Sequence, residues 1–168
     1  MVLEGNSIGA KPQSSECLHP DFFQVYVPRP DGYREQESVQ IPVEFSEWKK
    51  VSVDLPPFPL VLPIRIDPAS QPCVIELTGL RLLGPGGQEL WRLSDFTASQ
   101  LQLAGDAVAI SRGAIVKILS DGQDPQILLP PLAREGGESS VRLEVSVRID
   151  VHLLTVAKCL GDYLRAAL

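Results

Sequence analysis

The sequence predicts an all-β fold, an antiparallel β-sandwich followed by a C-terminal α-helix. Apolar and polar residues alternate through successive segments between Glu37 and Leu83, as they do in strands that bury one face. The chain has 15 prolines and 13 glycines among 168 residues, which indicates many turns and therefore many short strands. The alternation stops after Val151, where apolar residues recur at helical spacing.

The first half of the chain contains four predicted strand segments. The first runs from Phe22 to Val27, with Phe22, Gln24 and Tyr26 on the outer face. Its inward residues, and those of the three segments that follow, are Phe23, Val25 and Val27, then Val39, Ile41, Val43 and Phe45, then Val51, Val53 and Leu55, then Leu62, Ile64 and Ile66. Each segment therefore has one apolar face for a shared core.

The second half continues the same pattern with one interruption. Within Cys73–Leu83 the inward residues stand at odd positions before Gly79 and at even positions after it, which predicts a β-bulge at Gly79. The glycine-rich stretch 84–87 predicts a hairpin turn into Glu89–Leu93. Short strands are expected at 101–103, 107–110, 114–119 and 126–129, with a turn at 121–124, and a long final strand at 141–151.

Three parts are expected along the chain. Residues 1–19 lack periodicity and predict a flexible lead-in, and residues 20–151 predict the sandwich domain. Residues 152–168 predict a helix that leads toward a further domain of a longer protein. The apolar stripe of this helix consists of Leu153, Val156, Ala157, Leu160, Leu164 and Ala167.

Charge and composition exclude several classes of partner. A net charge of −6 and a pI near 4.9 argue against nucleic acid, because phosphate binding needs clustered lysines and arginines. No segment approaches the roughly 20 apolar residues of a membrane span, and residues 1–13 do not resemble a signal peptide. Three widely spaced cysteines indicate free thiols in a reducing compartment, so we expect a cytoplasmic protein.

The sequence offers little material for catalysis. Its two histidines, His19 and His152, lie far apart, and the stretch 84–87 lacks the lysine of a phosphate-binding loop. Cys73 and Cys159 occupy positions typical of small buried hydrophobes. The segment 121–124 lacks the ligand pattern of a calcium loop, although a structural calcium elsewhere in the sandwich stays open. We therefore expect no catalytic residue, no cofactor and no metal ligand.

Aromatic residues on polar faces are the best indication of a binding site. If the strand already runs at Trp48, this side chain falls on the same polar face as Lys50 and on the opposite face from Val51. Tyr26 lies on the outer face of the first strand. Tyr33 follows the turn at 28–32. Flat rings of this kind stack on the C–H faces of sugars. The alternative is that loops or the terminal helix cover these rings, which would give them a structural role.

A family resemblance points in the same direction. The motifs that carry it are QVYVP at 24–28, DGYRE at 31–35, IRIDP at 64–68 and GQDPQILLP at 122–130. With these motifs the chain, from about Phe22 to Val151, resembles a β-sandwich module of bacterial glycosyltransferases that assemble surface polysaccharides. That module resembles a carbohydrate-binding jelly roll beside the catalytic domain. The resemblance implies a jelly-roll type of sandwich, and it carries over no established sugar ligands.

Together these observations predict a non-catalytic carbohydrate-binding-like module. It would hold a glycan acceptor for an adjoining glycosyltransferase domain. The candidate contacts are Tyr26, Tyr33 and Trp48 for stacking, with Arg65 and Asp67 for sugar hydroxyls. The alternative is a structural or assembly domain that forms interdomain or homo-oligomer contacts through the stripe Leu153–Leu164 and binds no sugar. Asp67 also has a structural interpretation, because aspartate before proline can end a strand.

Overall fold

The computed structural model describes residues 21–93, 100–111, 114–133 and 137–152, together with positions 157, 161 and 164. Strands make up 64% of the described residues, which confirms the all-β prediction. The only helical element within the described ranges is a short 3-10 turn, η1 (Glu35–Glu37). The strands are β1 (Asp21–Tyr26), β2 (Ser38–Val43), β3 (Lys49–Pro59), β4 (Arg65–Asp67), β5 (Cys73–Leu83), β6 (Glu89–Arg92), β7 (Gln102–Ser111), β8 (Val116–Leu128) and β9 (Glu138–Asp150).

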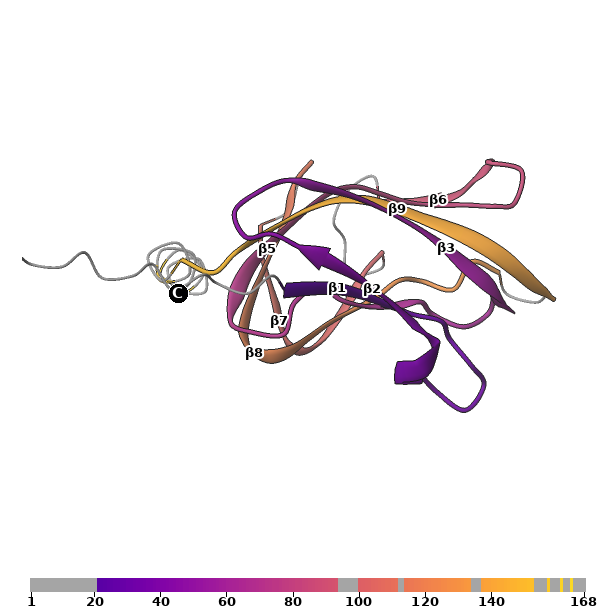
Figure 1. The fold of residues 1–168 in the computed structure, drawn as a ribbon, viewed down its shortest axis with the longest axis horizontal. Coiled ribbons are helices and arrows are strands. Elements are labelled where there is room, and N and C mark those ends of the chain that lie inside the picture. Colours follow the sequence, from indigo (N-terminus) through magenta and orange to yellow (C-terminus); the bar gives the residue numbers. More distant parts are fainter. Residues whose placement is uncertain are drawn as a thin grey trace, which may run out of the picture.

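All the strand pairs are antiparallel, and together they form one nearly closed, barrel-like sheet (Figure 1). The strand order is β2-β1-β4-β8-β5-β9-β3, with β6 paired to β5 and β7 paired to β8. The sheet has two layers, one with β2, β1 and β4 and the other with β5, β9, β3 and β6. β8 joins them, because residues 116–120 pair with β5 while residues 127–128 pair with β4. A parallel bridge between Phe45 and Ile149 brings the chain after β2 back to β9.

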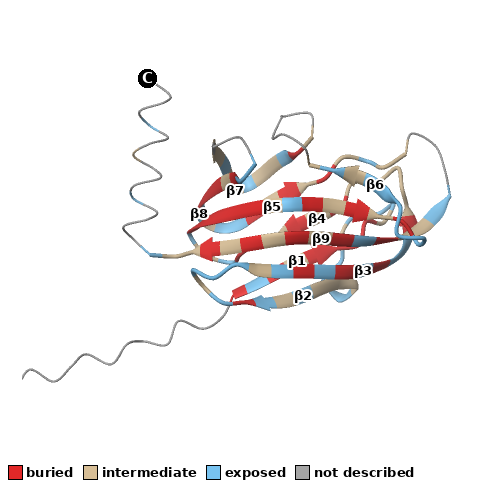
Figure 2. Ribbon diagram, turned by 90° about the horizontal axis from the view of Figure 1, so that it is seen from above, coloured by how far each residue is buried: buried red, intermediate tan, exposed pale blue. Residues whose placement is uncertain are grey.

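Most of the predicted inward residues lie in the core or pack against it. Leu62 does not, because the strand predicted from residue 62 begins only at Arg65. Phe23, Val25 and Val27 are buried, and Val51, Val53 and Leu55 are buried in the same way on β3. Figure 2 shows the resulting alternation of buried and more exposed positions along the strands. Cys73 also lies in the core, where burial raises the pKa of its thiol to about 12. Hydrophobic burial of about 1.5–3 kcal/mol for each large side chain stabilises this arrangement.

The predicted bulge and hairpin of β5 are both present. The register between β5 and β9 shifts between Thr78 and Arg81, and Gly79 has φ +65°. Glycine reaches this left-handed backbone region without the strain that a Cβ atom introduces. The hairpin to β6 closes through Gly84, whose N–H donates to the Gln88 carbonyl at 2.8 Å. The parity change in the sequence therefore locates a real irregularity of the sheet.

The prediction of four short strands between residues 101 and 129 is wrong. β7 and β8 are each continuous, and the segment 121–124, expected as a turn, is an excursion within β8 opposite Asp106. The Asp106 carboxylate accepts hydrogen bonds from the backbone N–H groups of Gln123 and Asp124, at 3.0 and 3.1 Å. A Cβ atom at Gly105 would lie 1.9 Å from the Asp124 carbonyl oxygen, so only glycine fits there. The Asp106 side chain thus supplies the hydrogen-bond acceptor that the β7–β8 pairing does not give these two N–H groups, and β8 continues through the segment.

Two predictions fall outside the described residues. The lead-in at 1–19 lies wholly outside them, and so does most of the helix at 152–168, together with its oligomer contacts. Only Ala157, Gly161 and Leu164 of that segment are described as helical, so the helix stays a prediction. In the part of the chain that is described, no helix has the length and hydropathy needed to cross a membrane.

Candidate carbohydrate-binding site

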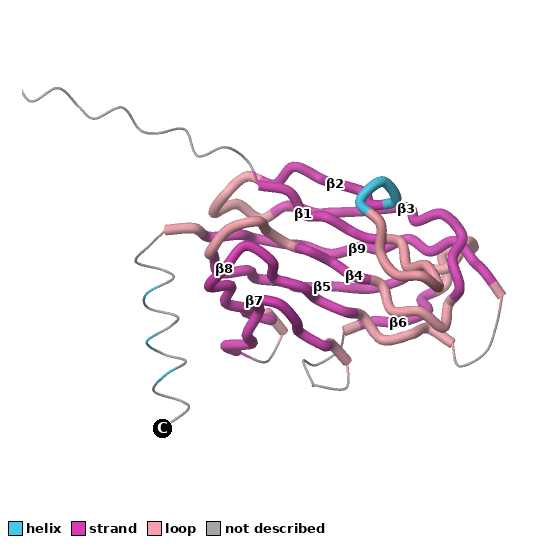
Figure 3. Tube along the Cα trace, turned by 90° about the horizontal axis from the view of Figure 1, so that it is seen from below, coloured by secondary structure: helices cyan, strands magenta, loops and turns pink. Residues whose placement is uncertain are grey.

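The structure divides the five predicted site residues between two places. Tyr26, Tyr33, Arg65 and Asp67 gather beside β1 and β4, in the layer that Figure 3 shows from below. Trp48 lies just before β3, which pairs with β9 in the other layer. The first group is called here the tyrosine–arginine cluster.

Strand register creates the tyrosine–arginine cluster. Tyr26 on β1 lies opposite Arg65 on β4, and the Arg65 guanidinium carbon is 4.8 Å from the centre of the Tyr26 ring. The Tyr33 ring meets Tyr26 edge to face, with centroids 6.2 Å apart, and its centre lies 5.8 Å from the same guanidinium carbon. Arg65 also donates from Nε and Nη2 to the two carboxylate oxygens of Asp67, at 2.7 and 2.6 Å. The Arg65 guanidinium thus interacts with both tyrosine rings and with the Asp67 carboxylate at the same time.

The tyrosine hydroxyls of the cluster are occupied by protein partners. Tyr26 donates to a carboxylate oxygen of Glu35 at 2.7 Å, and Tyr33 donates to the Pro63 carbonyl at 2.8 Å. Tyr26 is only 7% exposed although it lies on the outer face, so its ring offers no open surface to a sugar. Burial, with the Glu35 hydrogen bond, raises the pKa of the Tyr26 phenol above its usual range.

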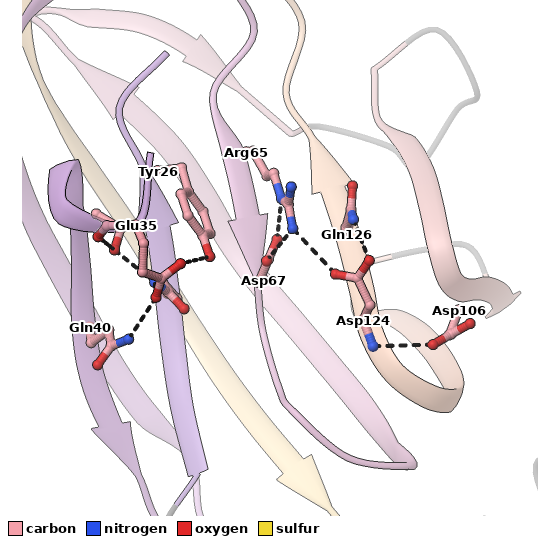
Figure 4. A network of polar contacts seen from close by, with 10 residues as sticks. Tyr26, Glu35, Gln40, Arg65, Asp67, Asp106, Asp124 and Gln126 are labelled. Atoms are coloured by element: carbon pink, nitrogen blue, oxygen red, sulfur yellow. Dashed lines mark hydrogen bonds and ion pairs between the residues drawn. The ribbon is translucent and has the colours of Figure 1, made fainter. Parts of the chain in front are cut away.

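Further hydrogen bonds extend the cluster across β8 (Figure 4). Arg65 Nη2 lies 3.2 Å from a carboxylate oxygen of Asp124, whose other oxygen accepts from Gln126 at 2.7 Å. The backbone N–H of Asp124 is the group that Asp106 binds. Desolvation raises the pKa of Asp67 despite its bond to Arg65. The network therefore joins β1, β4, β8 and β7, which is a structural role.

The cluster makes a prediction for acid titration. The Gln24 side chain makes the larger contribution, and the Tyr26 hydroxyl the next, to lowering the pKa of the Glu35 carboxyl by hydrogen bonding. The ionised Glu35 carboxylate therefore stabilises the fold fully above about pH 4.3, and this stabilisation is lost as the pH falls through the lowered pKa. We expect Tyr26→Phe to raise the pKa of Glu35 toward its ordinary value. An NMR titration of the Glu35 carboxyl carbon measures this change. An unchanged pKa in the variant would contradict the hydrogen bond.

Trp48 is the predicted site residue that stays open to solvent, with 43% of its surface exposed. The guanidinium carbon of Arg148 on β9 lies over it, 5.3 Å from the ring centre. Arg148 is held by Glu76, which is 4% exposed and also binds the Lys117 ammonium at 2.6 Å. The indole is thus placed by a cation that is itself fixed, which limits how far the ring can move.

The loop before β3 completes the surroundings of Trp48. Ser46 has φ +65°, and its N–H donates to the Ile149 carbonyl at 2.7 Å, so the loop is tied to β9. A hollow of about 210 Å³ is lined by Trp48, Glu44, Glu47 and Lys49. Two carboxylates and an ammonium beside an exposed indole can bind hydroxyls while the ring stacks on a sugar face. Sequence reasoning missed Glu44 and Glu47, although both lie in the loop that leads to Trp48.

No protein-family model, curated protein or solved structure matches the chain. Among the predicted contact residues, Trp48 is the large hydrophobic side chain that lies exposed at the surface.

Proposed function

We propose that this chain is a non-catalytic carbohydrate-binding-like module, a sandwich of the jelly-roll type that works in the cytoplasm beside a bacterial glycosyltransferase domain. It holds or positions a glycan acceptor for that enzyme. The observation that carries the proposal is the exposed indole of Trp48 beside the carboxylates of Glu44 and Glu47. An aromatic ring and hydroxyl-binding groups in one hollow are what sugar recognition requires.

A role in holding the glycan agrees with an open and shallow site. A module attached to its enzyme by a short flexible linker raises the local concentration of bound glycan to the millimolar range. Weak binding by one aromatic ring and a few polar groups is then sufficient for function. The hollow beside Trp48 supplies such a contact without enclosing the sugar.

Tryptophan fluorescence tests the proposal directly. The chain has two tryptophans, so Trp91→Phe leaves Trp48 as the sole source of tryptophan emission. Trp91 is partly buried against the core. We expect the emission to change and to saturate at millimolar concentrations of at least one member of a panel of neutral and acidic oligosaccharides. The unmodified chain serves as the control for folding. No response to any member of the panel contradicts the proposed function.

A further inference from the structure

We propose that the outer face of β3, β9, β5 and β6 is a trough that binds an acidic polysaccharide, one that carries carboxylates along its length. This inference rests on the proposed function and names its class of ligand. Figure 2 looks down on the layer formed by these strands, with β5, β9 and β3 side by side. The trough begins at Trp48 and follows β3 and β9 toward the β5–β6 hairpin.

The strand register places outer side chains in rows across this face. Lys50 lies opposite Ser146, and Ser146 opposite Thr78, while the row beyond it runs from Ser52 through Glu144 to Arg81 and Arg92. The Trp48 row comes before these two, and the row of Asp54 and Arg142 comes after them. Because a strand rises about 3.3 Å per residue, the surface from Trp48 to Asp54 is about 20 Å long. That length suits a chain of sugars better than a single one.

Small residues make the middle of this face concave. Ser52, Gly79 and Ser146 are the small residues that line a hollow of about 440 Å³, together with the longer side chains of Lys50, Arg81 and Arg92. A second hollow of about 280 Å³ continues along the same strands between Asp54, Arg142 and the 84–87 turn. The strand register places the two hollows one after the other along β3 and β9, so a ligand that contacts both has to be extended.

The charge of the central hollow is opposite to that of the whole chain. Its lining has three cations, Lys50, Arg81 and Arg92, and one carboxylate, Glu144, whereas the chain has a net charge of −6. Lys50 makes no ion pair with any residue in the described ranges. Arg81 donates to Glu144 from Nε and Nη2, at 2.9 and 2.6 Å, which leaves its remaining guanidinium N–H groups for a ligand.

The mixture of groups favours an acidic glycan over other anionic polymers. Glu144, Asp54, Ser52 and Ser146 lie among the cations and suit hydroxyls, whereas an unbroken row of phosphates would meet these carboxylates as like charges. Arg92 donates from Nε and Nη2 to a Glu89 carboxylate oxygen, at 3.0 and 2.6 Å, so like Arg81 it has only its remaining N–H groups for a ligand. A sugar that carries a carboxylate offers the anion for Lys50 and the hydroxyls for its neighbours. A neutral sugar leaves the Lys50 ammonium without an ionic partner, whereas Arg81 and Arg92 keep their protein carboxylates.

Calorimetric titration of the full chain tests the inference. The probes are hexagalacturonate and a hyaluronan hexasaccharide, with maltohexaose as a neutral sugar of equal length and a twelve-nucleotide oligothymidylate as a different polyanion. We expect at least one acidic sugar to bind about tenfold more tightly than maltohexaose and to bind more weakly as salt is raised. Lys50→Glu is expected to weaken the acidic sugar about tenfold or more. Ser146→Phe, which fills the hollow, should weaken it comparably.

The matched control is Arg34→Glu, which makes the same change in charge at an exposed arginine in the β1–β2 connection of the other layer. It should leave binding unchanged, and circular dichroism checks that all three variants are folded. Equal binding of maltohexaose and the acidic sugars, or no effect of Lys50→Glu, overturns the inference while the proposed function stands. No binding of any sugar overturns both. Oligothymidylate that binds as tightly as the acidic sugars, with the same loss in Lys50→Glu, overturns the choice of a glycan.

Discussion

Replacing Phe23 by alanine is expected to lower the free energy of unfolding by about 3–5 kcal/mol. Phe23 has no exposed surface, and it lies on β1 among core residues from both layers. The loss combines the transfer of a large ring out of water with the cavity that remains when the surrounding strands relax only in part. Since a domain of this size has a stability of roughly 5–15 kcal/mol, this is a large fraction of the whole.

The adjacent residue provides the matched control. Phe22 is 46% exposed on the opposite face of the same strand, so we expect Phe22→Ala to change stability by no more than about 0.5 kcal/mol. Urea denaturation followed by far-ultraviolet circular dichroism measures both variants. Equal losses from the two changes would mean that the alternation along β1 does not separate core from solvent.

Replacing Trp48 by alanine is expected to reduce glycan affinity about thirtyfold. Stacking on the exposed indole removes apolar surface worth about 2 kcal/mol from water, and each 1.4 kcal/mol corresponds to a factor of ten in Kd. The free energy of unfolding should change little, because the ring contacts Arg148 on the surface and lies outside the core. The effect is thus specific to binding.

Two further variants make this result interpretable. Phe22→Ala removes an equally exposed aromatic ring from the other layer and should leave the affinity unchanged. Tyr26→Phe removes a hydroxyl of the tyrosine–arginine cluster and should leave it unchanged as well. Titration of each variant with the best oligosaccharide of the panel gives the comparison. Full affinity in Trp48→Ala would remove Trp48 from the site.

Local patterning predicts the faces of strands well, because the period of two is a property of the backbone itself. Phe22 and Phe23 fall on the predicted sides, and the parity change at Gly79 locates the bulge of β5. The same reasoning places Trp48 on the outer face beside Lys50. In each of these cases the answer depends only on the residue and its neighbours in sequence.

The errors arise where distant segments meet. The sequence shows that Tyr26 points outward, but not that Glu35 and Arg65 cover it. The continuity of β8 depends on the Asp106 carboxylate of the neighbouring strand, which binds the backbone of segment 121–124. The tertiary contact overrides local turn chemistry at that point.

The trough requires knowledge of register. Ser52 and Ser146 are unremarkable in sequence, and they line one hollow only because β3 and β9 pair with residue 50 opposite residue 146. Arg81 and Arg92 become neighbours only through the β5–β6 hairpin. A one-residue change in any of these registers would turn the same side chains to the other face.

Glycan binding at Trp48 and along the trough is tested most directly by an NMR map of the amide and tryptophan indole resonances of the isotope-labelled full chain during titration with the acidic oligosaccharides. We expect the shifts to concentrate on the Trp48 indole and on Lys50, Ser146 and Arg81, which lie on one face of one layer. Shifts confined to Tyr26, Tyr33 and Arg65 in the other layer, or no shifts at saturating concentrations, would contradict this expectation.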